Sequence, residues 1–143
     1  MISAVDTNVI VGLWDAEERD HLAALDLLDE AASRGGVVIC GAVFGELLAG
    51  PGRTEEFIND FLEDAEVSVD WSSNETIWRT AGLAFQKYAA RRRRQRADEA
   101  RRILTDFYIG AHALENGYSL LTLDDGIYRV AFPKLRIFSV RPR

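Results

Sequence analysis

The amino-acid sequence predicts an α/β fold of one domain, with a mostly parallel sheet of about five strands. Five short apolar segments are separated mainly by longer segments with helical spacing, and this alternation is typical of parallel α/β folds. Residues 37–40 are continuously apolar, as in strands that are buried on both faces of a parallel sheet. The length of 143 residues suits a single domain with its own apolar core. We therefore expect one domain that covers residues 1–143.

The first half of the chain supplies three of the strands. Residues 2–5 are short and apolar, and they stop at Asp6, Thr7 and Asn8, whose side chains favour turns and helix caps. Residues 18–33 place leucine and alanine at helical spacing before two glycines end the pattern, which predicts a helix. The other elements expected here are a strand at 37–40, an almost wholly apolar helix at 41–50, a helix at 54–64 and a strand at 67–69.

A long stretch without proline, at residues 73–116, must contain a reversal of the chain. Helix propensity alone would allow one helix there, about 66 Å long at about 1.5 Å per residue, whereas a domain of this size is about 40 Å across. We expect Ser73 to cap a first helix, and Thr105 to cap a second helix that carries Asp106 in its first turn. The reversal then lies on or near the arginine-rich residues 87–102.

The last region completes the sheet. We expect a fourth strand at residues 119–122, a turn at Asp124, Asp125 and Gly126, and a final strand at residues 135–140. Because helices separate most of the strands, these strands run parallel and their carboxyl ends lie along one edge of the sheet.

The charge of the chain is unevenly distributed. Its 17 basic and 23 acidic residues give a formal net charge of −6, which argues against a general nucleic-acid binder. Residues 87–102 contain eight basic and two acidic residues, a local charge of +6, so nine basic and 21 acidic residues leave −12 elsewhere. The densest part of this basic segment is Arg91, Arg92, Arg93 and Arg94. The segment attracts RNA, docks an acidic stretch of a partner protein, or is only a solvated helix face.

Several residues are assigned no function. Cys40 is the only cysteine, so no internal disulfide is possible, and its apolar surroundings predict a buried strand end. His21 and His112 receive no role. Six aromatic side chains are expected to fill the core rather than to stack on bases: Trp14, Trp71, Trp78, Tyr108, Tyr118 and Tyr128. The apolar runs are too short to span a bilayer and the chain has no basic start, so we expect no membrane association and a cytoplasmic location.

Four acidic residues that are far apart in the sequence are expected to converge. Ligands of open parallel sheets bind beyond the carboxyl ends of the strands. Asp6 follows the first strand and Asp124 the fourth, while Asp106 begins the helix that leads into the fourth strand. Taken singly, Asp6 could cap a helix, Asp106 could complement a helix dipole and Asp124 could belong to a turn.

Glu46 is the hardest of the four to explain structurally, because it is the only polar side chain among residues 41–50. A carboxylate in apolar surroundings is costly unless it is paired or bound to a cation. Several carboxylates in one pocket repel one another and raise their pKa values, and a divalent cation would relieve both penalties. Oxygen ligands suit Mg²⁺ or Mn²⁺, and no cluster of cysteine or histidine favours zinc.

In order and spacing, these residues resemble the acidic motifs of PIN domains, and most closely those of the VapC toxins of type II toxin-antitoxin systems. The resemblance rests on Asp6 in Val-Asp-Thr-Asn-Val, on Glu46 in a small apolar helix, on Asp106 in Asp-Phe-Tyr-Ile-Gly-Ala-His-Ala and on Asp124 in Leu-Thr-Leu-Asp. It spans essentially the whole chain, and the combination of four motifs is fairly specific.

The resemblance implies a PIN-like three-layer α/β/α domain with the activity of a cytosolic endoribonuclease that depends on Mg²⁺ or Mn²⁺. Such proteins are often homodimers, and a cognate VapB-like antitoxin inhibits them by covering the acidic pocket. The resemblance also implies that Asp6, Asp106 and Asp124 hold the metal, with Glu46 completing the catalytic pocket. Hydrolysis would then need no protein nucleophile, and whether one or two ions take part stays open.

Further positions match residues that would support the carboxylates by hydrogen bonds, namely Thr7, Asn8 and Thr122. The family pattern places the functional acid two residues after this threonine, which selects Asp124 over Asp125.

Two other classes of function stay open from the sequence. A phosphotransfer or phosphatase domain could use an acidic pocket on a similar sheet. A haloacid dehalogenase, however, would need a second aspartate at the position of Asn8, and a receiver domain would need adjacent acids after the first strand. The other alternative is a non-catalytic PIN domain that binds RNA or a partner through its basic segment, which would leave Glu46 unexplained. RNA cleavage with and without Mg²⁺ or Mn²⁺ distinguishes these functions.

Overall fold

The computed structural model describes residues 1–95 and 102–140 of the chain. Its strands are β1 (Ser3–Val5), β2 (Val37–Cys40), β3 (Val67–Asp70), β4 (Ser119–Leu121) and β5 (Ile137–Phe138). Its helices are α1 (Thr7–Trp14), α2 (His21–Arg34), α3 (Gly41–Ala49), α4 (Glu55–Asp64), α5 (Glu75–Gln95), α6 (Leu104–Glu115) and α7 (Gly126–Ala131).

The strands form one parallel sheet in the order β3-β2-β1-β4-β5. The central strand β1 pairs Ser3 with Val37 of β2, and on its other side it pairs Val5 with Leu121 of β4. The chain therefore builds β2 and β3 on one side of β1 and then crosses over to build β4 and β5 on the other. The expected α/β class with a parallel sheet is confirmed, and the direction in which strands are added reverses between β1 and β4.

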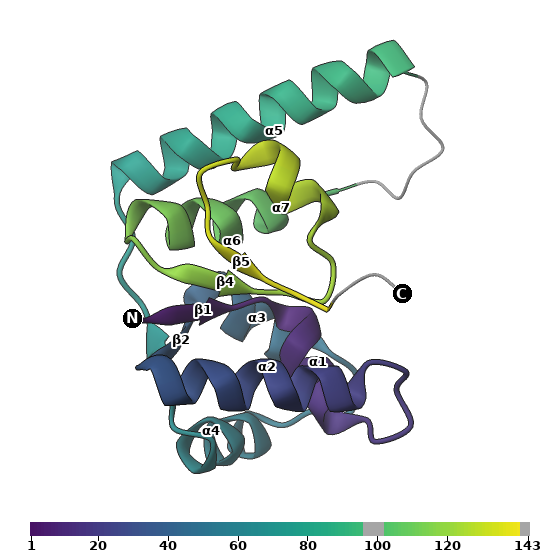
Figure 1. Cartoon of the computed structure of the whole chain (residues 1–143), viewed down its shortest axis with the longest axis vertical. Helices are drawn as coiled ribbons and strands as arrows, with labels where there is room; N and C mark the ends of the chain where they lie inside the picture. Colours follow the sequence, from purple (N-terminus) through teal and green to yellow (C-terminus); the bar gives the residue numbers. More distant parts are fainter. Residues whose placement is uncertain (96–101, 141–143) are drawn as a thin grey trace.

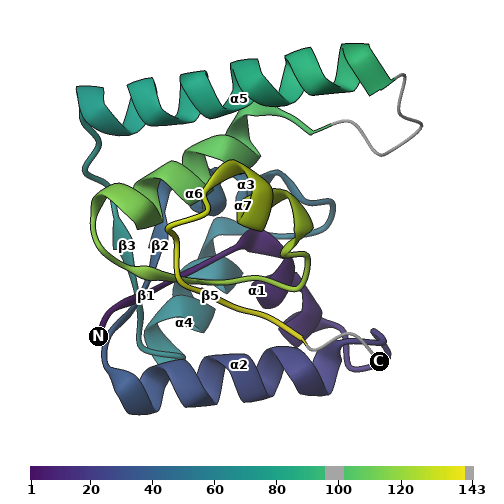
Figure 2. The ribbon, with the colours of Figure 1, turned by 45° about the horizontal axis from the view of Figure 1, so that its top comes forward.

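Helices cover both faces of this sheet and give three layers. The helices α2 and α4 lie on one face and α5 and α6 on the other, with α5 outermost (Figure 1 and Figure 2). Every residue of β1 and β4 is buried, as strands covered on both faces must be. Helix α6 packs against α5 and is buried at every residue from Phe107 to Ala113. None of the helices in the described part of the chain is long and apolar enough to cross a membrane.

The sequence does not predict two of the short helices. Helix α1 begins at Thr7, directly after β1, and α7 begins at Gly126, where a turn is expected. Neither has a side-chain hydrogen bond that caps its first turn, and helices this short are not stable from propensity alone. Both bury apolar surface, including Val9 and Ile10 of α1 and Tyr128 of α7. Tertiary packing therefore stabilises them.

The expected reversal of the long helical stretch is confirmed, because α5 ends at Gln95 and α6, which packs against it, begins at Leu104. The cap expected at Ser73 is wrong. The side chain of Asn74 accepts from the backbone N–H of Ile77 at 3.0 Å and caps α5. The hydroxyl of Ser73 accepts instead from the hydroxyl of Tyr108, at 2.8 Å.

The cap expected at Thr105 is also wrong, since α6 begins before it and its N-cap is Ile103. Asp106 is in the first turn, as expected, and its carboxylate accepts from the backbone N–H of Ile103 at 3.3 Å. Two arginines of the basic segment, Arg96 and Arg101, lie outside the described residues.

Two of the six aromatic side chains expected in the core are exposed. Trp71 is 66 % exposed and Trp78 is 52 % exposed. Each still packs on one side, Trp71 edge-on against Phe44 and Trp78 against Tyr108, with ring centroids 5.0 Å and 4.5 Å apart. An apolar sequence pattern does not show which side of a helix or strand end the rest of the fold leaves exposed. Here each of the two tryptophan side chains stays partly in solvent.

Candidate active site

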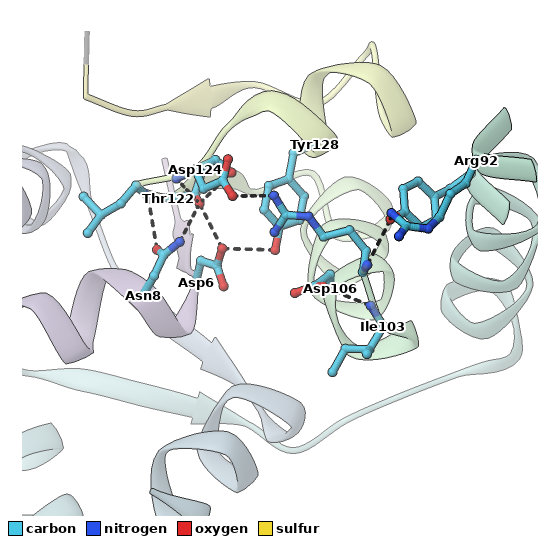
Figure 3. A network of polar contacts seen from close by, with 11 residues as sticks. Asp6, Asn8, Arg92, Ile103, Asp106, Thr122, Asp124 and Tyr128 are labelled. Atoms are coloured by element: carbon cyan, nitrogen blue, oxygen red, sulfur yellow. Dashed lines mark hydrogen bonds and ion pairs between the residues drawn. The ribbon is translucent and has the colours of Figure 1, made fainter. Parts of the chain in front are cut away.

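The predicted acidic residues lie where the strand order reverses. At such a reversal, neighbouring connections leave on opposite faces of the sheet, and the carboxyl ends of the two strands are open to a ligand. The strands concerned are β1 and β4, and Asp6 and Asp124 come shortly after their ends. Figure 3 shows Asp106, from the start of α6, beside these two residues. We call Asp6, Glu46, Asp106 and Asp124 the acidic site.

Asp6 is the most buried member of the acidic site, with 7 % of its surface exposed. This burial raises the pKa of Asp6 to about 6 against the opposing effect of hydrogen bonds from Thr122 and Tyr128, and the negative charge of Asp106 raises it further. The hydroxyl of Thr122 donates at 2.9 Å and that of Tyr128 at 3.0 Å, both to Oδ2 of Asp6. Asp6 is therefore held in position but is costly to ionise, and a nearby cation would reduce that cost.

Thr122 connects the ends of β1 and β4 (Figure 3). Its hydroxyl donates to Asp6 and accepts from the backbone N–H of Asp124 at 3.1 Å. The side-chain amide of Asn8 donates to the Thr122 hydroxyl at 3.4 Å, and its carbonyl accepts from the backbone N–H of Leu123 at 3.1 Å. Thr122 makes the hydrogen bond to a carboxylate that was expected of it, whereas Asn8 bonds Thr122 and the backbone of Leu123 and so supports Asp6 only indirectly.

Glu46 is half-buried on α3 and connects to the rest of the acidic site through Thr7. The hydroxyl of Thr7 donates to Oε1 of Glu46 at 2.7 Å. Thr7 directly follows Asp6 in the chain and begins α1, which packs against α3. The support expected from Thr7 therefore goes to Glu46, and it sets this carboxylate beside the end of β1.

Asp124 forms an ion pair with Arg102 that the sequence did not predict. The guanidinium of Arg102 donates to Oδ2 of Asp124. Burial alone would lower the pKa of Arg102, but this hydrogen bond and the charges of Asp124 and Asp106 outweigh burial and raise it. Within the basic segment, Arg102 is the residue closest in sequence to Asp106, but a charge run does not reveal which of its members folds back onto a strand end.

Tyr128 is a second residue of this site that the sequence did not single out. It lies on α7 and is buried, with its hydroxyl on Asp6. Burial, followed by the charges of Asp6 and Asp106, raises the pKa of Tyr128, so this hydroxyl stays protonated and can donate. Recognition of α7 as a helix would have been needed to place Tyr128 over the acidic site.

The acidic site offers only carboxylate oxygens, which suit Mg²⁺ or Mn²⁺ better than zinc. As the side chains stand, no group of three or more histidine, cysteine, aspartate or glutamate side chains among residues 1–95 and 102–140 is arranged to hold a metal ion. Two of the carboxylates have other partners: Asp124 pairs with Arg102, and Asp106 accepts from Ile103.

His112 and Cys40, which were given no role, are both buried. His112 is buried in α6, with Nε2 2.8 Å from Oδ2 of Asp70 at the end of β3, an edge strand. A hydrogen bond from Ser72 lowers the pKa of Asp70 most, and burial opposes it. The contact with His112 lowers this pKa as well, so it stays below its ordinary value. Cys40 is buried, and this burial raises the pKa of its thiol, which disfavours a nucleophilic thiolate.

Comparisons with known proteins identify the family and the fold. The sequence model of the PIN domain matches residues 4–133, a range that includes the whole acidic site. No curated protein matches the sequence. Among solved structures, VapBC-1 from nontypeable Haemophilus influenzae is similar with a TM-score of 0.65 and 23 % sequence identity, over 97 % of this chain and 98 % of that chain.

Two more solved structures share the fold. VapBC2 from Rickettsia felis, bound to a DNA fragment from their promoter, has a TM-score of 0.61 and 17 % identity, over 99 % of this chain and 100 % of that chain. VapC20 from Mycobacterium tuberculosis, a sarcin-ricin loop cleaving toxin, has a TM-score of 0.59 and 20 % identity, over 94 % and 98 %. These similarities establish the fold, and the family match extends over nearly the whole chain. The chain belongs to the PIN domain family.

Proposed function

We propose that this protein is an endoribonuclease that depends on Mg²⁺ or Mn²⁺, hydrolyses RNA phosphodiester bonds and acts as the toxin of a toxin-antitoxin pair. The observation that carries the proposal is the placement of Asp6. This buried carboxylate, with its raised pKa, lies at the strand reversal beside Asp106 and Asp124. Membership of the PIN family and the fold shared with VapC toxins support it.

The residues divide into ligands and supports. Asp6, Asp106 and Asp124 would hold the cation, and Glu46 would complete the catalytic pocket. The hydroxyls of Thr122 and Tyr128 both contact Oδ2 of Asp6, so Oδ1 is the oxygen that these two groups leave to a cation.

Mg²⁺ or Mn²⁺, when bound, would polarise the scissile phosphate and lower the pKa of the attacking water. The chain itself would orient the carboxylates through Thr7, Asn8, Thr122 and Tyr128. The proposed reaction is therefore direct hydrolysis, without a covalent intermediate on the protein.

A polyanionic substrate must overcome the repulsion of the acidic site, and the basic end of α5 offers the opposite charge. Arg93 and Arg94 are exposed there, and Arg91 and Arg92 are half-buried. Helix α5 packs against α6, which carries Asp106. We propose that these arginines hold RNA by its phosphates while the acidic site cuts it, since phosphate contacts position a substrate without supplying chemistry.

The proposed partners are a VapB-like antitoxin and a second copy of the chain. Large apolar side chains are exposed on four helices, and they would be covered by such partners: Leu22, Leu48, Phe57, Trp78 and Leu83. Light scattering during size-exclusion chromatography would measure the mass of the protein alone and after co-expression with the antitoxin. A monomer in both samples would contradict both partnerships.

Cleavage of total cellular RNA tests the activity. Purified protein should cut RNA with Mg²⁺ or Mn²⁺, and cleavage should stop in excess EDTA. The Asp106→Asn variant should be inactive with either metal while it keeps the circular-dichroism spectrum of the wild type. Equal cleavage in EDTA would contradict metal dependence. RNA binding without cleavage would indicate a non-catalytic PIN domain, and a phosphorylated protein would indicate phosphotransfer.

A further inference from the structure

Arg102 places a positive charge of the chain itself within the acidic site. Its guanidinium donates to Oδ2 of Asp124, one of the three proposed metal ligands. The negative charge of Asp106 also acts on the same guanidinium. The guanidinium of Arg102 therefore interacts with two carboxylates of the acidic site, those of Asp124 and Asp106.

The backbone of Arg102 is anchored, which distinguishes this contact from an ordinary surface ion pair. Its N–H donates to the hydroxyl of Tyr88 at 2.9 Å. Tyr88 is buried on α5 and packs against Phe107 of α6, with ring centroids 5.3 Å apart. The side chain of Arg102 is 28 % exposed, compared with 56 % for Arg129, whereas its partner Asp124 is 53 % exposed, compared with 34 % for Asp125. A partly buried cation on an anchored backbone loses less entropy on pairing than a free surface side chain.

The ion pair and the metal site make opposite demands on Asp124. The oxygen of Asp124 that accepts from Arg102 is occupied by a cation of the chain itself. A divalent cation that takes Asp124 as a ligand must therefore displace a positive charge or bind beside it. Either way the two cations oppose each other.

We propose that Arg102 competes with the divalent cation for Asp124, so that metal binding requires this ion pair to open. The inference rests on the metal site of the proposed function. Without metal, Arg102 neutralises part of the acidic site and holds Asp124 away from coordination. With metal, the guanidinium is released next to the site, where a phosphate of the substrate is a suitable new partner.

Removal of the competitor should strengthen metal binding. Titration calorimetry with Mn²⁺ alone should show that Arg102→Gln binds about three- to fivefold more tightly than the wild type, the upper part of the range expected for loss of one partly exposed ion pair. Arg102→Lys, which keeps the charge but not the planar fork, should lie between the two. The matched control is Arg129→Gln, which removes the same charge from the neighbouring pair with Asp125 and should change the affinity less than twofold.

A second readout follows Arg102 itself. In ¹⁵N NMR spectra, the guanidinium resonances that disappear in Arg102→Gln should shift when Mg²⁺ is added to the wild type, because the metal takes the Asp124 carboxylate that accepts from Nη2 of Arg102. The Nε–H resonance of Arg129 should stay in place.

The outcomes distinguish failure of the competition from failure of the metal site. Equal Mn²⁺ affinity of wild type and Arg102→Gln, or weaker binding by the variant, overturns competition and leaves the metal site standing. Weaker binding would show that Arg102 orients Asp124 as a ligand. If Arg129→Gln changes the Mn²⁺ affinity as much as Arg102→Gln does, loss of any nearby positive charge explains the effect, and the proposal is also overturned. If neither wild type nor Arg102→Gln binds Mn²⁺, the metal site fails, and the proposed function and the competition fail with it.

Discussion

The hydroxyl of Tyr128 donates to Oδ2 of Asp6 at 3.0 Å, although 122 positions separate the two residues in the sequence. This bond brings α7 over the end of β1. It also stabilises the ionised form of Asp6 and opposes the rise in pKa that burial causes. Tyr128 is thus a positioning residue that acts on the reaction through Asp6.

Substitution of this tyrosine should separate positioning from packing. Tyr128→Phe keeps the buried ring and removes the donor, so the pKa of Asp6 should rise further and the free energy of unfolding should fall by about 1 kcal/mol. The acid limb of the pH–rate profile should move to higher pH. Tyr118→Phe is the control, because the Tyr118 ring packs against His112 and not at Asp6. An unchanged acid limb in Tyr128→Phe would show that the hydroxyl contributes only to stability.

Asp6→Asn should stabilise the metal-free protein at neutral pH. The folded-state pKa of Asp6 is raised from 3.8 to about 6. Between these values the unfolded chain has released its proton while the folded chain keeps it, so stability falls as pH rises and is lowest above about pH 6. Ionisation of Asp6 lowers the free energy of unfolding by about 3 kcal/mol in full, at 1.36 kcal/mol per pKa unit. Asp6→Asn avoids this loss, but its gain is smaller because Asn accepts weaker hydrogen bonds from Thr122 and Tyr128.

Urea unfolding in EDTA at about pH 5 and about pH 8 measures this effect. The stability of Asp6→Asn relative to the wild type should increase between the two pH values by about 1–2 kcal/mol. Asp125→Asn, which loses a pair with the exposed Arg129, should show little change. With Mn²⁺ present the ranking should reverse, because the metal stabilises only the protein that can bind it. Equal metal-induced shifts in Tm for wild type and Asp6→Asn would contradict the site.

Asp124 and Asp125 should contribute unequally to activity. Asp124 is fixed by its backbone N–H to Thr122 and pairs with Arg102, whereas Asp125 pairs with Arg129 four residues later on α7. Asp124→Ala should therefore reduce kcat by at least about 100-fold, the order expected for loss of a group that orients the catalytic centre. Asp125→Ala should lower kcat less than about threefold, because its partner Arg129 is exposed and such pairs contribute little. Single-turnover cleavage of a defined RNA measures both effects. The reverse ranking would show that Asp125, and not Asp124, is the functional acid.

The exposed arginines of α5 should bind substrate rather than catalyse. In Arg93→Gln/Arg94→Gln, KM should rise several-fold with little change in kcat, and the salt dependence of RNA binding should fall by about one unit of slope per lost phosphate contact. Arg92 is left in place because it donates to the hydroxyl of Tyr88, which anchors Arg102.

The control for the arginine pair is Arg19→Gln/Arg79→Gln, which removes two positive charges elsewhere and should leave KM nearly unchanged. If both variants cut RNA like the wild type but the arginine pair weakens the antitoxin complex, the segment docks the antitoxin. If neither property changes, the arginines form a solvated face.

The sequence by itself determined the parallel α/β class and the positions of the carboxylates along the chain. Continuous apolar strands such as Val37–Cys40 are stable only between two covered faces, and strand ends in a parallel sheet share one edge, so Asp6 and Asp124 could be assigned to that edge before any contact was known. The isolated polarity of Glu46 was equally local information.

Tertiary structure alone decided what surrounds these carboxylates. Helix α7 has no side-chain cap and too few residues to form independently, so the position of Tyr128 over Asp6 depends on packing. The pairing of Arg102 with Asp124 depends on how the chain reverses between α5 and α6, and any arginine of the basic segment satisfied the sequence pattern equally well. Composition places charges in the chain, but hydrogen bonds and ion pairs between distant residues form only after burial has fixed the backbone that carries them.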